Sequence, residues 1–310
     1  MKKLVTIFLL LQACYASAQT TNEDKADSLK NVSTVTYYTK AIETNPNDAS
    51  AYYKRALALR KLGEVKKALS DIEKVISLEP KNNDAFIERG IIKHDSEDYD
   101  GAIADYTKAL AIKQTTTAFY ERGFSKRLKK DYKGAIDDFS KAIAIDPKDD
   151  NAYFGRGLAK RFSGDYKGAI DDFTKTLLLN SKSSNSYYHR GLSKYALEDY
   201  KGAIEDYSKG IEIVPADPDF YYERGNAKRR INESQSAVID FTKAFELNPE
   251  FLDALNNRGG AKLDTEDFEG ALADYKQVLA ADKEYSSAYY NIGVAYENLE
   301  DLSAAVDNYT

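Results

Sequence analysis

The 310-residue chain contains no tryptophan, one cysteine, one methionine and two histidines. A single cysteine excludes an internal disulfide and a metal site built from several cysteines. His94 and His189 lie far apart, and neither has a second histidine or cysteine at metal-ligand spacing. No serine stands in the sequence context of a nucleophile elbow. We therefore expect no bound metal, no cofactor and no enzymatic activity.

The chain also lacks an excess of basic residues, because its formal net charge is −6. Charged residues make up 30% of the chain and are of both signs. A nucleic-acid-binding domain normally presents a concentrated basic patch. We therefore expect no nucleic-acid partner.

A repeat with a period of about 34 residues is the main feature that the sequence does contain. In the copy at 116–149, apolar residues recur at helical spacing in two segments, which predicts two helices. Asp131 is placed to cap the second helix, and Pro147 is placed to end it. Gly123 and Ala135 are small, so we expect the two helix backbones to approach closely there.

The shared positions resemble the motif of the tetratricopeptide repeat (TPR) family, which has an aromatic residue at position 4 and small residues at positions 8 and 20. The resemblance extends from about residue 31 to the end of the chain. It implies an all-α fold, a right-handed α-solenoid of about eight stacked helix-turn-helix repeats whose concave groove holds a partner peptide or protein. The aromatic residues at position 4 are Tyr52, Phe86, Phe119, Tyr153, Tyr187, Tyr221 and Tyr289, and the alanines at position 20 are Ala68, Ala102, Ala135, Ala169, Ala203, Ala237, Ala271 and Ala305.

The repeat register divides the chain into predicted segments. We expect a signal peptide at 1–18, a flexible spacer at 19–30, an N-terminal half repeat or cap at 31–48, and eight repeats at 49–82, 83–115, 116–149, 150–183, 184–217, 218–251, 252–285 and 286–310, the last of them incomplete.

The first residues resemble a bacterial export signal. Two lysines precede a short apolar run at 4–11, and Ala16-Ser17-Ala18 fits the small-residue rule for cleavage before Gln19. The segment around Cys14 also resembles a lipoprotein box, in which the cysteine is lipidated. We therefore expect a periplasmic or cell-envelope protein, with an outer-membrane lipoprotein as the alternative. Membrane contact is expected only if Cys14 is lipidated.

Two charged positions of the repeat vary together. In the eighth repeat they become Ile292 and Asn308, so we predict that the two positions face each other as ion pairs; the alternative is that the arginines bind an anionic ligand. Glycine at position 19 is also unusual, and we expect it to allow close packing on the neighbouring repeat. Position 7 holds Arg55, Arg89, Arg122, Arg156, Arg190, Arg224 and Arg258; position 23 holds Asp71, Asp105, Asp138, Asp172, Asp206, Asp240 and Asp274; and position 19 holds Gly101, Gly134, Gly168, Gly202 and Gly270.

The family resemblance implies that certain positions of the first helix line the concave groove. Position 5 is aromatic at Tyr53, Tyr120, Phe154, Tyr188, Tyr222 and Tyr290, and position 12 is basic at Arg60, His94, Arg127, Arg161 and Arg229. An aromatic row beside a cationic row would suit an acidic or aromatic-bearing peptide. The alternative is that the tyrosines pack between hairpins and the arginines are solvated.

Some family members grip a peptide carboxylate with five side chains, of which only Asn226 and Asn257 match here. Because the charged members of that set are absent, we do not expect this type of clamp. The two asparagines would suit hydrogen bonding to an extended peptide backbone.

We predict a protein–protein interaction scaffold that binds a partner peptide or protein in the concave groove. One alternative is a lipid-anchored envelope-complex subunit that docks through its C-terminal edge, where Tyr289, Ala305 and Tyr309 would lie near an open end. A second alternative is a sensory or accessory segment of a larger protein.

Overall fold

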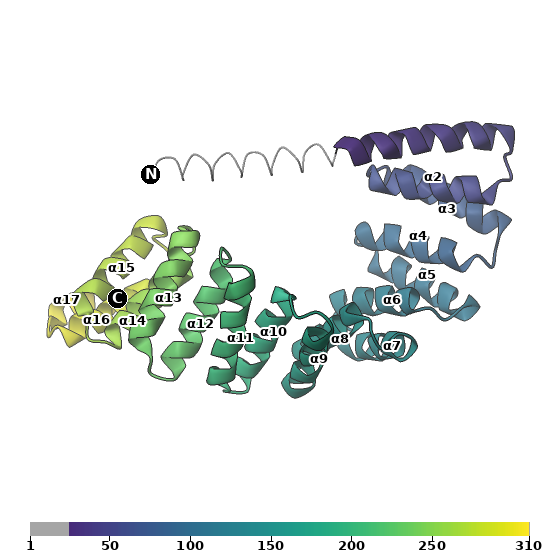
Figure 1. The fold of residues 1–310 in the computed structure, drawn as a ribbon. Helices are drawn as coiled ribbons and strands as arrows, with labels where there is room; N and C mark the ends of the chain where they lie inside the picture. The colour runs from purple at the N-terminus through teal and green to yellow at the C-terminus, as the bar shows by residue number, and fades with distance from the viewer. Residues whose placement is uncertain (1–24, 310) are drawn as a thin grey trace, which may run out of the picture. The chain divides into compact units, whose positions relative to one another are not determined.

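The computed structural model describes residues 25–309, and these residues form helices joined by turns, without a strand (Figure 1). They build an all-α helical repeat solenoid. The helices are residues 25–44, α2 (Ala49–Lys61), α3 (Val65–Leu78), α4 (Asn83–Asp95), α5 (Tyr99–Ile112), α6 (Thr116–Leu128), α7 (Tyr132–Ile145), α8 (Asp150–Phe162), α9 (Tyr166–Leu179), α10 (Ser184–Ala196), α11 (Tyr200–Ile213), α12 (Pro218–Arg230), α13 (Ser234–Leu247), α14 (Leu252–Leu263), α15 (Phe268–Ala281), α16 (Ser286–Asn298) and α17 (Leu302–Tyr309).

The first described helix begins earlier than we expected. We predicted a flexible spacer through residue 30, but residues 25–30 are helical. The physical reason is that residues 25–44 contain neither glycine nor proline, so no helix-breaking residue prevents the helix from starting at residue 25.

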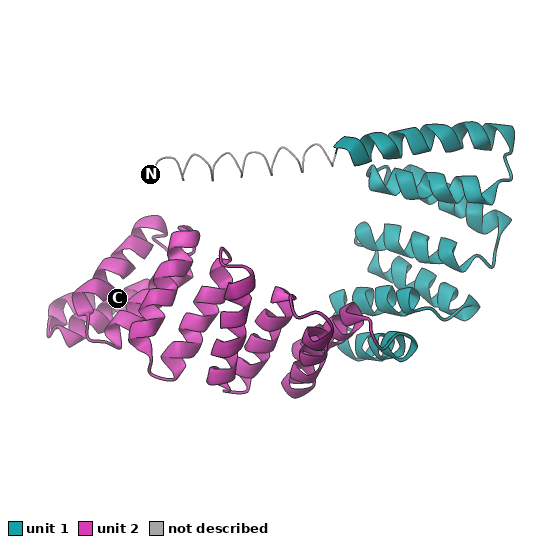
Figure 2. Ribbon diagram, in the orientation of Figure 1, with its two compact units in different colours: residues 1–147 teal, residues 148–310 magenta. Residues whose placement is uncertain are grey.

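The helices gather into two compact units, residues 1–147 and residues 148–310 (Figure 2). Within each unit, even-numbered helices pack against the odd-numbered helices on both sides of them in the chain. Successive even-numbered helices also contact one another, as in α2 with α4 and α12 with α14. Successive odd-numbered helices of the described residues make no such contact. The even-numbered helices therefore lie on the inner side of each unit's curve, and we call them the inner helices.

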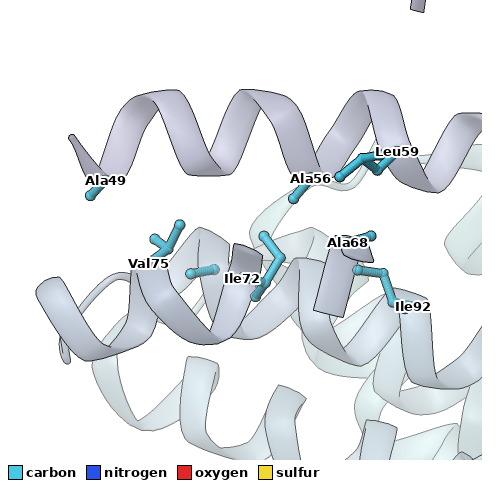
Figure 3. Close-up of a cluster of buried hydrophobic side chains, with 8 residues drawn as sticks. Ala49, Ala56, Leu59, Ala68, Ile72, Val75 and Ile92 are labelled. Carbon is cyan, nitrogen blue, oxygen red and sulfur yellow. The ribbon is translucent and has the colours of Figure 1, made fainter. Parts of the chain in front are cut away.

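Matched residue sizes hold the two helices of a hairpin together. A Cβ atom added to Gly191 would lie 2.6 Å from Cε1 of Tyr207, so no methyl group fits between this inner helix and that ring. In the first hairpin Ala56 replaces the glycine and the smaller Ile72 replaces the aromatic ring (Figure 3). The close approach of the two helices that we expected at Gly123 is present, because a Cβ atom there would lie 3.3 Å from the Phe139 ring. Phe139 is fully buried at this contact.

The glycines at position 19 have a local cause. Asp131 caps α7 as predicted, because its Oδ1 accepts a hydrogen bond of 3.0 Å from the Gly134 backbone N–H. A Cβ atom on Gly134 would lie 2.2 Å from the Oδ2 atom of the same Asp131. Our expectation that these glycines allow packing on the neighbouring repeat is therefore wrong. They make room for the capping carboxylate, and the same geometry recurs at Gly101, Gly168, Gly202 and Gly270.

Candidate functional site

A buried ion cluster joins the two helices of the hairpins between residues 83 and 285. In one of them, Nε and Nη2 of Arg190 lie 2.9 and 2.6 Å from the two carboxylate oxygens of Asp206, which is 2% exposed. Nζ of Lys194 lies 2.9 Å from the same carboxylate. The predicted Arg–Asp pairing is confirmed, whereas the lysine was missed. The clusters are Arg89–Asp105–Lys93, Arg122–Asp138–Lys126, Arg156–Asp172–Lys160, Arg190–Asp206–Lys194, Arg224–Asp240–Lys228 and Arg258–Asp274–Lys262.

The sequence carried a signal for the missed lysine, because it follows each of these arginines by four residues and so lies on the same helix face. The first hairpin has only the Arg55–Asp71 pair, at 2.7 Å, and Leu59 stands where the lysine would be.

The arginines of these clusters are also engaged on their remaining sides. Nη1 of Arg190 donates a 3.0 Å hydrogen bond to Thr174 of the preceding hairpin, and its guanidinium lies 5.6 Å from the ring centroid of Tyr187. Burial alone would raise the pKa of Asp105, but hydrogen bonds from Arg89 and Lys93 outweigh this effect and hold that pKa below its ordinary value. These contacts favour a structural role over our alternative that the arginines bind an anionic ligand.

The predicted groove residues of the first hairpin do not form a free cationic and aromatic surface. Nε of Arg60 lies 2.6 Å from Glu88, and its Nη1 lies 3.5 Å from Asp95. Tyr53 packs against the hydrophobic core. Burial, together with nearby Glu88, raises the pKa of Tyr53 to about 12.

The next predicted pair in unit 1 is also packed. The Tyr120 ring lies edge-on to Phe139 at 5.5 Å, and the Arg127 guanidinium lies 4.9 Å from the Phe124 ring centroid. Burial lowers the pKa of Arg127. Nδ1 of His94 lies 2.7 Å from Oγ of Ser125. Among residues 25–309, no group of three or more histidine, cysteine, aspartate or glutamate side chains is placed to hold a metal ion.

In unit 2, Phe154, Arg161 and Tyr188 are likewise packed against neighbouring side chains. The ring centroids of Phe154 and Phe173 are 5.7 Å apart, and Tyr188 lies edge-on to Phe220 at 5.4 Å. The Arg161 guanidinium lies 4.4 Å from the ring centroid of its neighbour Phe162. For these aromatic residues, our alternative of packing between hairpins describes the structure better than an exposed row.

A continuous row of amide side chains crosses three inner helices of unit 2. Nδ2 of Asn257 donates to the Tyr222 hydroxyl at 3.1 Å and to Oδ1 of Asn226 at 2.9 Å. Asn256 donates to Asn257 at 3.4 Å, and Asn291 donates to Asn256 at 3.2 Å. We call these five residues the asparagine row. The sequence prediction selected Tyr222, Asn226 and Asn257 but not the other two, although asparagines at adjacent positions of successive repeats were a visible signal.

A cavity of about 800 Å³ borders the asparagine row. Asn226 lines it together with Arg229, Arg230, Ser234 and Asp264. Nε of Arg229 lies 2.8 Å from the Asp264 carboxylate, so this predicted groove arginine is also ion-paired. The cavity is therefore polar, with charges of both signs.

The last described hairpin exposes apolar side chains at the end of the chain: Leu302 is 67% exposed, whereas Ala305 is buried. Tyr289 is 40% exposed, and the side chain of Tyr309 lies outside the described residues. Docking through this edge remains a prediction.

The predicted export signal, its cleavage site and Cys14 all lie outside residues 25–309. None of the helices within this range is both long and apolar enough to cross a bilayer. Export and lipidation therefore remain predictions.

Comparison with known protein families returns one kind of match. A family model described as "TPR repeat" matches residues 123–160, 191–232 and 261–300. Models described as "Tetratricopeptide repeat" match residues 37–70 and 218–251.

The curated relatives match a short segment. Hsp70-Hsp90 organizing protein 3 of Arabidopsis thaliana is 38% identical over 76 residues, which cover 24% of this chain and 14% of that protein. Hsp70-Hsp90 organizing protein 1 of Glycine max is 38% identical over 74 residues, which cover 24% of this chain and 13% of that protein. The chain thus matches about one seventh of the length of these relatives.

Solved structures are similar to a larger part of this chain than the curated relatives are. YrrB, described as a TPR protein with an unusual peptide-binding site, is 26% identical with a TM-score of 0.51, covering 57% of this chain and 92% of that one. The C-terminal part of a TPR repeat-containing protein from Cytophaga hutchinsonii has a TM-score of 0.67 at 19% identity, covering 77% of this chain and 99% of that one. At that identity the second likeness concerns the fold alone.

Proposed function

The chain belongs to the tetratricopeptide repeat family, and we propose that it is a non-enzymatic scaffold that binds an extended segment of a partner protein along the asparagine row of unit 2. The observation that carries this proposal is the hydrogen-bonded row itself, which runs from α12 through α14 to α16.

Asparagine side chains suit the recognition of an extended backbone. Each amide has one acceptor oxygen and two donor hydrogens, so a row of amides can both donate to peptide carbonyls and accept from peptide N–H groups. The hydrogen bonds among Asn226, Asn256, Asn257 and Asn291 hold the amides in place before a ligand arrives. A preformed surface loses less conformational entropy on binding, which favours affinity.

The comparisons support the class of partner. YrrB is described as having a peptide-binding site, and the curated relatives are named as organizing proteins for two chaperones. The acidic character that we expected of the partner remains a prediction. Arg60 and Arg229 now give it less support, because each is already paired with a carboxylate.

Peptide selection on the whole chain tests the proposal. We would select binding peptides from a random library, then compare the parent with Asn226→Ala/Asn257→Ala by calorimetric titration. A matched control is Lys243→Ala/Glu246→Ala, which removes an exposed polar pair from the outer helix α13. We expect at least about tenfold weaker binding for the asparagine variant alone, or about 1.4 kcal/mol. Equal affinity for all three folded proteins would overturn the proposal.

We further propose that the protein works outside the cytoplasm, on the basis of the export-signal pattern at 1–18. Mass spectrometry of the N-terminal peptide of the protein purified from cells tests this directly. A chain beginning at Gln19 would support the cleaved form, and an acylated Cys14 would support the lipoprotein alternative. An intact Met1 would contradict export.

A further inference from the structure

The cavity beside the asparagine row lies where one bulky side chain of the repeat is missing. Among the odd-numbered helices from α3 to α17, all but α13 begin with a bulky apolar or aromatic residue. These first residues are Val65, Tyr99, Tyr132, Tyr166, Tyr200, Phe268 and Leu302. Helix α13 begins instead with Ser234, which lines the cavity. A hydroxymethyl group therefore stands where the hairpins on both sides place a ring.

The preceding hairpin shows how a ring is held at this position. The Tyr200 ring lies edge-on to Tyr195 of its own hairpin, with the ring centroids 5.1 Å apart. The guanidinium of Arg230, from the next inner helix, lies 5.4 Å from the centroid of Tyr200. Nε and Nη2 of Arg230 also donate hydrogen bonds of 3.2 and 3.1 Å to the Tyr200 hydroxyl. The space between successive inner helices is thus built to hold an aromatic ring with a polar edge.

Around Ser234 the two corresponding positions carry opposite charges. Arg229 stands at the repeat position of Tyr195, and the repeat position of Arg230 is taken by Asp264. Nε of Arg229 lies 2.8 Å from the Asp264 carboxylate, and the Ser234 hydroxyl donates to the same carboxylate at 3.0 Å. About 800 Å³ of space remains beside these groups, a volume in the range of small-ligand pockets. The ion pair therefore orders the wall of the cavity without filling it.

The cavity is accessible from the asparagine row. The side chains of Arg229 and Asp264 are 30% and 39% exposed, so the wall that they form is open to solvent. Asn226 belongs to the asparagine row and lines the cavity as well. A peptide segment that lies along the row therefore passes the cavity and can place one side chain in it.

We propose that this cavity binds an aromatic side chain of the partner, with tyrosine preferred over phenylalanine. The inference rests on the proposed function, since it assigns a side chain to the segment that lies along the asparagine row. Nε and Nη2 of Arg229 bond to the Asp264 carboxylate in the plane of the guanidinium, and an arginine held in this way can stack its face on an aromatic ring. Asp264 and Asn226 carry oxygen atoms that accept from a phenol hydroxyl, a donor that phenylalanine lacks.

The test uses small probes, so that it does not depend on peptide binding to the asparagine row. Ligand-observed NMR titrations of the whole chain would measure the dissociation constants of N-acetyl-tyrosine amide, N-acetyl-phenylalanine amide and N-acetyl-leucine amide. We expect saturable binding of the tyrosine probe, with the phenylalanine probe about threefold weaker and the leucine probe at least tenfold weaker.

Two matched pairs of variants locate the site. Ser234→Tyr gives α13 the ring that its neighbours have, and it should weaken binding of the tyrosine probe at least tenfold because the cavity is then filled from within. Val65→Tyr makes the corresponding change at the start of α3 in unit 1 and should leave binding unchanged. Arg229→Met keeps most of the aliphatic stem but removes the guanidinium, so binding should weaken about threefold. Arg161→Met, at the same repeat position of α8, should have no effect.

Several results would overturn the inference. They are no saturable binding of the tyrosine probe, a leucine probe that binds as tightly, or a folded Ser234→Tyr variant that binds as tightly as the parent. If Ser234→Tyr does not fold, equal binding by Arg229→Met and the parent would overturn it instead. A phenylalanine probe that binds at least as tightly as the tyrosine probe would contradict the stated preference. These results leave the proposed function standing, because the peptide titration with Asn226→Ala/Asn257→Ala tests the asparagine row separately.

Discussion

Two kinds of hairpin differ in the residues that join their two helices. One kind comprises the hairpins between residues 83 and 285, and the other is the last described hairpin, α16–α17. Each of the former has an Arg–Asp–Lys cluster between its helices. The last hairpin has Ile292, Asn308 and Tyr296 at the three corresponding positions. Ile292 is 3% exposed and packs in the core, and the Asn308 amide donates to the Ala304 carbonyl at 2.8 Å.

The difference shows that the charge cluster is not required for a helical hairpin of this shape. Replacing a buried ion pair with apolar residues of similar size is often neutral or stabilising, whereas removing one partner is strongly destabilising. That asymmetry explains why the positions change together. In several clusters the arginine also donates a hydrogen bond to the preceding hairpin, as in Arg190 to Thr174, so these charges help to specify how neighbouring hairpins align.

The largest expected effect comes from breaking one cluster. Asp206→Leu leaves Arg190 and Lys194 half-buried without their carboxylate, and it should lower the free energy of unfolding by about 3–5 kcal/mol. Urea denaturation followed by circular dichroism measures the loss. The triple variant Arg190→Leu/Lys194→Met/Asp206→Leu should recover most of it; a triple variant as unstable as the single one would argue against the pairing.

The converse change introduces charge into the last hairpin. Ile292→Arg alone buries an unpaired guanidinium and should cost about 2–4 kcal/mol, because the site offers no carboxylate. Adding Asn308→Asp should restore most of that stability, since the pair then matches the other hairpins. Thermal unfolding of the two variants beside the parent checks this, and additive losses would show that the two positions do not interact there.

A smaller effect is expected at the size-matched position that most hairpins share. Gly191→Ala places a methyl group against the Tyr207 ring and should cost about 1–3 kcal/mol. Tyr207→Ile should relieve the clash, because the first hairpin combines Ala56 with Ile72 in this way. Denaturation of the single and double variants measures the relief. No rescue in the double variant would mean that the Ala56–Ile72 combination depends on other neighbours.

The smallest effect concerns the helix caps. Asp199→Ala removes the acceptor for the Gly202 N–H and should cost about 1 kcal/mol. Glu233→Ala is the control, because the Glu233 side chain makes no capping hydrogen bond to α13. Equal losses in the two variants would show that the capping bond contributes nothing measurable.

Much of the fold was predictable because it depends on contacts within one repeat. The small residue opposite a large one, the Asp131 cap and the Arg–Asp pairing each involve positions at most 16 residues apart, and these positions recur with the repeat period. The lysine of each cluster was equally local. It was missed because it does not vary strictly together with the other two residues: Leu59 replaces it in the first repeat, where Arg55 and Asp71 are kept. The glycines at position 19 were misjudged because their neighbour is a capping side chain three residues earlier.

The groove could not be predicted in the same way. The sequence gives no means of distinguishing the arginines that occupy position 12. In the structure, Arg60 pairs with Glu88 and Arg229 pairs with Asp264. Arg127 and Arg161 lie on phenylalanine rings instead. Some of these partners lie 28 to 35 residues away, on the next inner helix or at its C-cap, and they differ from one hairpin to the next.

Repeat period and residue type were therefore sufficient for the helices, their pairing and their caps, since such contacts are short in sequence and repeated many times. Only the packing of successive inner helices decided which groove side chains are neutralised and which form the asparagine row. The physical reason is that a charge or hydroxyl is satisfied by whatever the neighbouring hairpin presents, and neighbouring hairpins differ most at the positions that face the groove.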